Sequence, residues 1–293
     1  MTKKQVNSKD GIAINPSPKK GLLQRYAAAP HMVWAVLFII APLIFVAYYA
    51  FTDASGAFSL ANVSAFFTKT YLIIFLRSLK LALISTAICL ILGYPIAYFI
   101  SRSKPKTQKI LILLIMLPMW MNFLIRTYAI MVLVQDTGII NSMLMSMNII
   151  KEPIHILGTE GAVIIGMVYD YLPFMILPIY SVMSKLDNRL IEAASDLGCN
   201  GFGVLCRVIF PLSLSGVISG VTMVLVPSIS TFYISQKLGG VDTLLIGDVI
   251  EQQYTASNYN MTASLSLVLM LILLIGLAVV NHYSDDEGGG MMP

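Results

Sequence analysis

Charged residues are scarce in this chain. Asp, Glu, Lys and Arg make up 12% of its 293 residues, against about 25% in a typical soluble domain, whereas 57% of the residues are hydrophobic. The mean hydropathy is +0.80. Because a soluble core cannot absorb that much apolar surface, the composition excludes an ordinary soluble domain and predicts a protein that faces lipid.

Cysteine is also rare, and the patterns that hold metals or nucleotides are missing from the sequence. The three cysteines, Cys89, Cys199 and Cys206, form no C-x-x-C pair, and the three histidines are scattered. No G-x-x-x-x-G-K-S/T motif occurs, so this chain is not expected to bind ATP through a P-loop. No Ser/His/Asp set or carboxylate pair suggests catalysis. We therefore expect a non-enzymatic chain without its own metal or cofactor.

Six long apolar runs are present, each close to the roughly 20 residues that cross a bilayer as a helix. The predicted spans are Met32–Phe51, Leu79–Ile100, Ile110–Val134, Ala162–Met183, Leu212–Ile234 and Met261–Val280. Several contain proline, which membrane helices tolerate because neighbouring groups satisfy the freed backbone. The sequence thus predicts an all-α membrane protein with six transmembrane helices, some of them kinked.

The basic residues predict how these spans are oriented. Thirteen of the nineteen Lys and Arg residues lie in the N-terminal tail and in the loops after the second and fourth spans. They gather at the ends of apolar runs, which is typical of membrane topology and not of a nucleic-acid-binding face. The positive-inside rule places both termini in the cytoplasm. The expected organisation is a flexible basic tail over residues 1–30, a six-helix domain over residues 31–281 and a disordered tail over residues 282–293.

A polar loop over residues 184–211 lies on this cytoplasmic side, between the fourth and fifth spans. Its motif is Glu192-Ala193-Ala194, then Gly198, then Ile209-Phe210-Pro211-Leu212. Asp187 or Asn188 is expected to cap a short helix over Leu190–Leu197, and Gly198 to end it in the left-handed conformation. Such a helix either contacts a cytoplasmic partner or lies along the membrane surface as an amphipathic helix.

Charged residues lie within or beside the predicted spans: Arg126 in the third, Asp170 in the fourth, and Arg77 and Lys80 at the start of the second. A charge at membrane depth is costly unless it faces protein or water. Asp170 therefore either faces a passing cation, which aromatic rings nearby would also attract, or forms an intramembrane ion pair with Arg126. Its neighbours Tyr169 and Tyr171 point away from it on a regular helix, so the three side chains cannot line one stripe.

The loops on the opposite side carry an excess of acidic residues. They hold three lysines, Lys69, Lys151 and Lys237, and seven acids, Asp53, Asp136, Glu152, Glu160, Asp242, Asp248 and Glu251. A negative outer mouth concentrates cations and repels anions. The alternative is an ordinary solvated surface.

The polar loop resembles the cytoplasmic coupling loop of permease subunits in bacterial ABC importers. Further segments resemble spermidine/putrescine permeases, and most of all the first of their two permease subunits. These segments are Gly93-Tyr94-Pro95-Ile96-Ala97-Tyr98, Leu117-Pro118-Met119-Trp120, Leu124-Ile125-Arg126-Thr127-Tyr128, Gly138-Ile139-Ile140-Asn141, Tyr171-Leu172-Pro173-Phe174-Met175-Ile176-Leu177-Pro178-Ile179-Tyr180 and Leu238-Gly239-Gly240. The resemblance runs from about Ala29 to Val280 in one collinear order.

This resemblance implies the permease fold of ABC type I importers, in the bacterial cytoplasmic membrane. It implies a second permease subunit, an ATPase dimer that uses the ATP, and an extracytoplasmic substrate-binding protein as partners. The residues expected to contact the ATPase are Glu192, Ala193, Ala194 and Gly198. The residues expected along a polyamine pathway are Trp120, Tyr128 and Asp170.

Three alternatives stay open. One is an importer of the same class for another solute, such as ferric iron, sulfate, molybdate or phosphonate. Another is a secondary transporter or channel that needs no ATPase and therefore no docking loop. The third is a membrane-anchored structural or assembly subunit, which would show no substrate-dependent transport.

Overall fold

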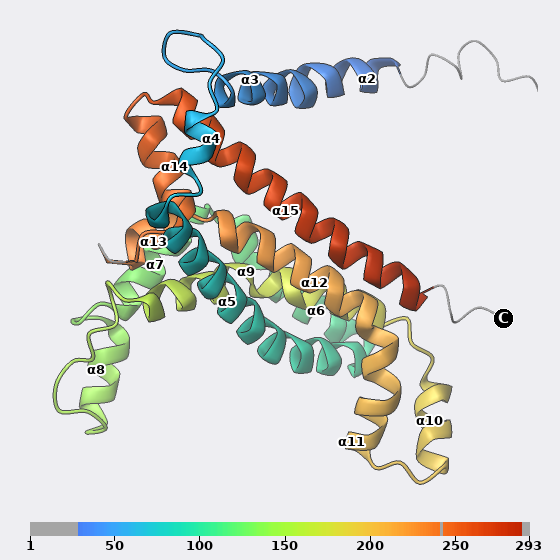
Figure 1. Ribbon diagram of the computed structural model, residues 1–293. Coiled ribbons are helices and arrows are strands. Elements are labelled where there is room, and N and C mark those ends of the chain that lie inside the picture. The colour runs from blue at the N-terminus through green and yellow to red at the C-terminus, as the bar shows by residue number, and fades with distance from the viewer. Residues whose placement is uncertain (1–28, 241–242, 289–293) are drawn as a thin grey trace, which may run out of the picture. The chain divides into compact units, whose positions relative to one another are not determined.

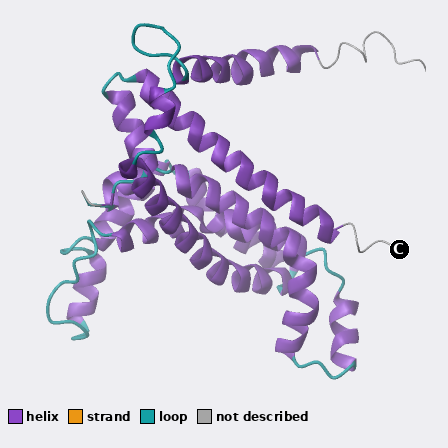
Figure 2. Cartoon of the chain, viewed as in Figure 1, coloured by secondary structure: helices purple, strands orange, loops and turns teal. Residues whose placement is uncertain are grey.

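The computed structural model describes residues 29–240 and 243–288, and this part of the chain is almost entirely helical (Figure 2). Its elements are α2 Ala29–Ala35, η1 Val36–Ile40, α3 Ala41–Ala50, α4 Ala61–Ala65, α5 Lys69–Arg102, α6 Pro105–Met116, η2 Leu117–Trp120, α7 Phe123–Val134, α8 Ile139–Ser146, α9 Glu160–Met183, α10 Asn188–Asp196, α11 Gly201–Val204, η3 Leu205–Ile209, α12 Phe210–Ser230, α13 Tyr233–Leu238, α14 Ile246–Thr255 and α15 Tyr259–Gly288. Of these, η1 and η3 are π-helical and η2 is a 3₁₀ helix.

The chain divides into two units, residues 1–46 and residues 47–293. The described part of the first unit is one helical run through α2, η1 and the start of α3, and it exposes large apolar side chains such as Trp34 and Phe38. An apolar surface of this kind requires lipid or another protein around it.

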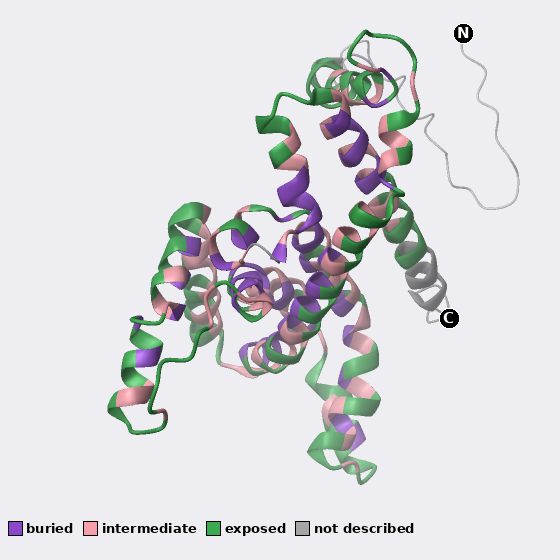
Figure 3. Ribbon diagram, turned by 60° about the vertical axis from the view of Figure 1, so that its left-hand side comes forward, coloured by how far each residue is buried: buried purple, intermediate pink, exposed green. Residues whose placement is uncertain are grey.

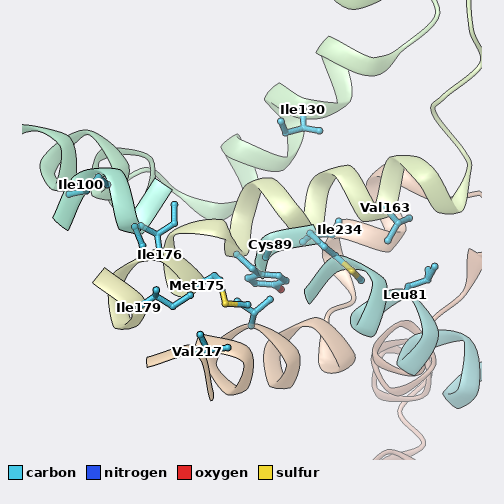
Figure 4. Packing of buried hydrophobic residues seen from close by; sticks show 14 of the residues in the cluster. Leu81, Cys89, Ile100, Ile130, Val163, Met175, Ile176, Ile179, Val217 and Ile234 are labelled. Atoms are coloured by element: carbon cyan, nitrogen blue, oxygen red, sulfur yellow. The ribbon is translucent and has the colours of Figure 1, made fainter. Parts of the chain in front are cut away.

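The core of the second unit lies where α5, α9 and α12 pack together (Figure 1). Met175 of α9 is fully buried between α5 and α12, near Cys89 and Val217 (Figure 4). Gly220 of α12 allows this approach, since a Cβ atom there would lie 2.8 Å from Met175 Sδ. Figure 3 shows that the buried residues concentrate in these central helices. Small residues at helix contacts are what close packing in a membrane requires.

A second, smaller cluster lies at the opposite end of α5 and α12 from the polar loop. Phe66, Ile246 and Leu265 are fully buried there and join the end of α4 to α14 and α15. Asn260 fixes the start of α15 by donating to the carbonyl oxygen of Thr52 at 2.8 Å. At this end of the unit the short helices α4 and α14 pack against the ends of the long helices α5, α12 and α15.

Six helical segments of the described residues are long and apolar enough to cross a membrane, as predicted. They are Pro30–Ala50, Lys69–Arg102, Phe123–Ser146, Glu160–Met183, Gly201–Ser230 and Tyr259–Val280. The predicted bounds are close for the first, fourth and sixth spans, whereas the second helix begins ten residues earlier than Leu79.

Two predicted spans were drawn wrongly. Ile110–Val134 is not one helix, because the backbone is extended at Met121 and α7 begins anew after Asn122, whose side chain caps it by accepting from the Leu124 N–H at 2.8 Å. Leu212–Ile234 is also interrupted, since α12 ends at Ser230 and Thr231 is extended. Hydropathy averaged over a span does not register either break, because the polar residues there, Asn122 at the first and Ser230 and Thr231 at the second, are few and lie between long apolar runs.

The two predicted tails differ in outcome. Residues 1–28 and 289–293 lie outside the described residues. The backbone of α15 stays helical to Gly288, where the sequence predicted a structureless tail from residue 282.

Candidate functional site

The polar loop folds as a capped helix, α10, in agreement with the prediction from its sequence. The side chain of Asp187 accepts a hydrogen bond from the Arg189 N–H at 3.0 Å and so caps the first turn. At the other end of the helix, the Gly198 N–H donates to the Ser195 carbonyl oxygen at 2.9 Å, and the Cys199 N–H donates to the Ala194 carbonyl oxygen at 3.1 Å. This pair of bonds is a Schellman motif, which satisfies carbonyl groups at the helix end.

Gly198 makes that motif possible. Its φ of +84° lies in the left-handed region, and a Cβ atom there would have nothing within 4 Å. Any substitution at this position would therefore be disfavoured by backbone conformation and not by collision.

The four predicted coupling residues do not share one environment. Glu192, Ala193 and Gly198 are exposed, whereas Ala194 is buried and packs in the same cluster as Val204 and Ile209. Ala194 thus seats α10 on the rest of its own chain, while Glu192 and Ala193 face outward.

Sequence reasoning missed two residues of this loop. Leu197 is 86% exposed and Phe202 is 74% exposed, one at each side of the Gly198 turn. Large apolar side chains this exposed on a polar loop are typical of a surface that another protein covers. The signal in the sequence was their isolation among polar and small residues.

The loop is tied to the membrane helices by Arg102 at the end of α5. Its Nη1 donates to the Asn188 side-chain oxygen at 2.5 Å, at the first residue of α10. The same guanidinium lies 5.9 Å from the centre of the Tyr98 ring. A displacement of α10 therefore acts directly on the end of the longest described helix of the chain.

Asp170 and Arg126 form the ion pair that was one of the two roles considered for them. Arg126 Nε lies 3.3 Å from Asp170 Oδ1, between α7 and α9. The two residues are 7% and 2% exposed. Among the described residues, neither of these two atoms has a hydrogen-bond partner, so each charge depends on the other for compensation. Tyr169 is exposed and Tyr171 is buried, as expected for residues that point away from Asp170.

The other two predicted pathway residues lie on the surface. Trp120 is 71% exposed at the end of η2. Tyr128 is exposed on α7 and its ring centre lies 6.3 Å from that of Tyr233 on α13. Lys237 lies over both tyrosine rings, with its Nζ 5.4 Å from the Tyr128 centre and 5.6 Å from the Tyr233 centre. Tyr233 and Lys237 were not predicted, because nothing in the sequence links α13 to α7.

The expected outer loops carry less free negative charge than their composition suggests. Glu160 is paired with Lys80, with 2.6 Å between Oε2 and Nζ. Asp248 is 1% exposed and accepts from the Leu245 N–H at 2.7 Å and the Ser235 hydroxyl at 2.9 Å. Burial raises the pKa of Asp248 to about 6, and the two hydrogen bonds act in the opposite direction. Asp242 lies outside the described residues.

The described residues contain no group of three or more His, Cys, Asp or Glu side chains that could hold a metal ion. The arrangement comprises exposed apolar side chains on the α10 loop, a buried ion pair between α7 and α9, and two tyrosine rings that contact the Lys237 ammonium.

Comparison with known proteins identifies the family. The family described as "Binding-protein-dependent transport system inner membrane component" matches residues 90–285. The chain is 41% identical over 261 residues to the spermidine/putrescine transport system permease protein PotB of Haemophilus influenzae, covering 86% of this chain and 91% of that protein. It is 37% identical to PotB of Escherichia coli, covering 84% of this chain and 92% of that protein.

Solved structures of importers share the fold. A chain from a bacterial ABC transporter that imports the acidic polysaccharide alginate aligns with a TM-score of 0.71 at 15% identity, covering 90% of this chain and 97% of that one. A chain of the MetNI methionine ABC transporter aligns with a TM-score of 0.58 at 13% identity, covering 75% of this chain and 99% of that one. The fold is therefore that of ABC importer permeases. With a family match over more than half of its length and relatives at 37–41% identity, the chain belongs to the family of binding-protein-dependent transport system inner membrane components.

Proposed function

We propose that the chain is a permease subunit of an ATP-driven importer and forms half of a translocation pathway for polyamines such as spermidine and putrescine. The observation that carries this proposal is the identity of 37–41% to proteins named as spermidine/putrescine permeases, over 84–86% of the chain. The ATP would be hydrolysed by a separate ATPase subunit.

The chemistry of the surface supports a cationic substrate. Tyrosine faces attract ammonium groups, and Tyr128 and Tyr233 already hold one, that of Lys237. Asp136 and Glu152 are exposed carboxylates in the loop between α7 and α9, where they would favour the approach of a polycation. An anionic solute would meet neither kind of partner there.

The α10 loop supports coupling to an ATPase. We infer that Glu192, Ala193, Leu197 and Phe202 contact a groove on that subunit, with Gly198 holding the turn between them. The apolar exposure of Leu197 and Phe202 supports a protein partner for this surface. The bond from Arg102 to Asn188 gives the docked helix a direct route to α5.

The remaining partners follow from the same proposal. A second permease subunit would complete the pathway and cover part of the apolar surface, lipid covering the rest. An extracytoplasmic binding protein would deliver the substrate at the end that carries α13 and α14. The excess of Lys and Arg near the α10 end supports a cytoplasmic location for both termini.

Reconstituted transport tests the proposal. The chain, its second permease, its ATPase and its binding protein would be placed in proteoliposomes, and uptake of labelled spermidine would be followed with and without ATP. We expect uptake only with ATP, and competition by unlabelled putrescine but not by sulfate. The polyamine importer would be contradicted if unlabelled spermidine and putrescine do not reduce the uptake, or if uptake proceeds without ATP.

A further inference from the structure

Lys237 lies where a substrate amine would bind. Its Nζ is 5.4 Å from the Tyr128 ring centre and 5.6 Å from the Tyr233 ring centre, and the two rings meet edge to face at 79°. An ammonium within about 6 Å of an aromatic face is attracted to the ring, and paired faces of this kind are how proteins recognise alkylammonium groups. The site is thus built for an ammonium and is filled by one.

The position of this site is fixed by buried neighbours. Leu238, next to Lys237, is fully buried, and its carbonyl oxygen accepts a hydrogen bond from the Gly158 N–H at 2.8 Å. Tyr233 packs against Phe123, with 6.0 Å between ring centres. The rings are therefore held by packed elements, while the Lys237 side chain itself is only half-buried.

Within residues 29–240 and 243–288, no carboxylate forms an ion pair with Lys237. The ion pairs among the described residues are Lys80 with Glu160, Arg126 with Asp170 and His155 with Asp136. Lys237 takes part in none of these. Two tyrosine side chains hold this ammonium, through their ring faces and a hydrogen bond with the Tyr128 hydroxyl. At a half-exposed position, an ammonium held in this way can exchange with another of the same kind.

The chemistry of the lysine side chain matches the proposed substrates. A lysine carries a primary ammonium at the end of four methylene groups, and putrescine and the longer arm of spermidine present the same aminobutyl group. A site that accepts Lys237 therefore accepts the end of a polyamine with the same reach and charge.

We propose that Tyr128 and Tyr233 form an ammonium subsite of the translocation pathway, and that Lys237 occupies it as a tethered competitor which an arriving polyamine displaces. This inference rests on the proposed polyamine function. The competitor keeps the subsite filled in the absence of substrate and lowers its net affinity for the polyamine. A site in a translocation pathway must bind its substrate with limited affinity, because a site that binds the substrate too tightly does not release it.

Removing the competitor should tighten binding. We expect Lys237→Met to lower the KM for spermidine uptake by about fivefold, the factor that corresponds to about 1 kcal/mol of cation–ring attraction. Lys151→Met removes an exposed lysine from the neighbouring loop and controls for general charge, so its KM should stay within about twofold of the unchanged complex. Combining Lys237→Met with Tyr128→Leu and Tyr233→Leu should abolish the gain.

Restoring the ammonium on the same folded protein gives a second test. Lys237→Cys in a cysteine-free background would be purified, reconstituted and alkylated with bromoethylamine, which rebuilds a side chain of lysine length and charge. The KM should rise back to that of the unchanged complex. Alkylation with iodoacetamide leaves the position neutral and should keep the KM low.

Three results would overturn the inference: an unchanged KM in Lys237→Met, an equal decrease in Lys151→Met, or a gain that survives loss of both tyrosine rings. Each presumes that the complex with the original sequence takes up spermidine. If that complex shows no spermidine uptake at all, the proposed function fails and this inference fails with it.

Discussion

Breaking the Arg126–Asp170 ion pair from one side should be far more damaging than removing both charges. At 3.3 Å and an effective dielectric constant of about 20, the Coulomb attraction is about 5 kcal/mol. Desolvation of two charges that are 7% and 2% exposed offsets much of this attraction in the intact pair. A single replacement strands the other charge without a hydrogen-bond partner among the described residues, which typically destabilises by about 3–5 kcal/mol.

The measurement is a double-mutant cycle on the assembled complex. Asp170→Asn and Arg126→Gln would each be scored for assembled complex by size-exclusion chromatography and for apparent melting temperature. At roughly 2–4 °C per kcal/mol, each single variant should lose about 6–20 °C or fail to assemble. The double variant should recover most of the loss, because two neutral amides of similar size replace the pair.

An exposed pair provides the control. Glu160→Gln breaks the contact with Lys80, whose side chain is 56% exposed, so it should change stability by less than about 1 kcal/mol. Recovery of spermidine uptake in the double variant would assign Asp170 to helix packing. The reasoning is refuted if both single variants assemble and melt like the unchanged complex, or if the double variant is as unstable as the worse single variant.

Three further predictions concern the loop, the topology and pH. Gly198→Ala should destabilise the turn after α10 by about 1 kcal/mol or more, which would appear as about fivefold faster hydrogen exchange across α10. Gly201→Ala is the control, because a Cβ atom there also has nothing within 4 Å and Gly201 has no left-handed φ, so exchange should stay unchanged. Equal exchange rates in the two variants would contradict the left-handed turn. Cysteines placed at Ser195 and Ser257 of a cysteine-free chain should react with an impermeant reagent from the inside and the outside of intact cells, respectively, and outside labelling of Ser195 would overturn the orientation. Burial raises the pKa of Asp248 to about 6, so proton binding by this carboxyl stabilises the fold fully below its ordinary pKa of 3.8, and that stabilisation is lost as pH rises through about 6. Asp248→Asn should remove this part of the pH dependence of the melting temperature. An unchanged profile would argue against burial of the carboxyl.

The sequence was sufficient for the features that depend on local composition. Apolar runs of bilayer length predicted the number of spans. Asp187 and Gly198 predicted both ends of α10, since caps and left-handed turns are encoded by the residues that form them. The interruptions at Met121 and Thr231 were not predicted, because an extended residue between two apolar helices leaves the hydropathy unchanged.

The contacts that define the candidate sites depend instead on packing between distant segments. The Arg126–Asp170 pair was one of two alternatives, and only the approach of α7 to α9 selects it. The partnership of Tyr128 with Tyr233 and Lys237 depends on α13 folding back onto α7. Such long-range contacts carry no local signature in a single sequence.

The helical run from Gly201 to Ser230 has a mechanical consequence. Through α11, η3 and α12 it continues for 30 residues, which at 1.5 Å per residue gives about 45 Å along the helix axis, with a bend between α11 and α12 (Figure 1). One end belongs to the α10 loop, and the other leads directly into α13, which carries Lys237. A displacement of the α10 loop would therefore be passed along this helix toward the segment that carries Lys237. The π-helical turn at Leu205–Ile209 lies at this bend, and π-turns are places where helices change direction.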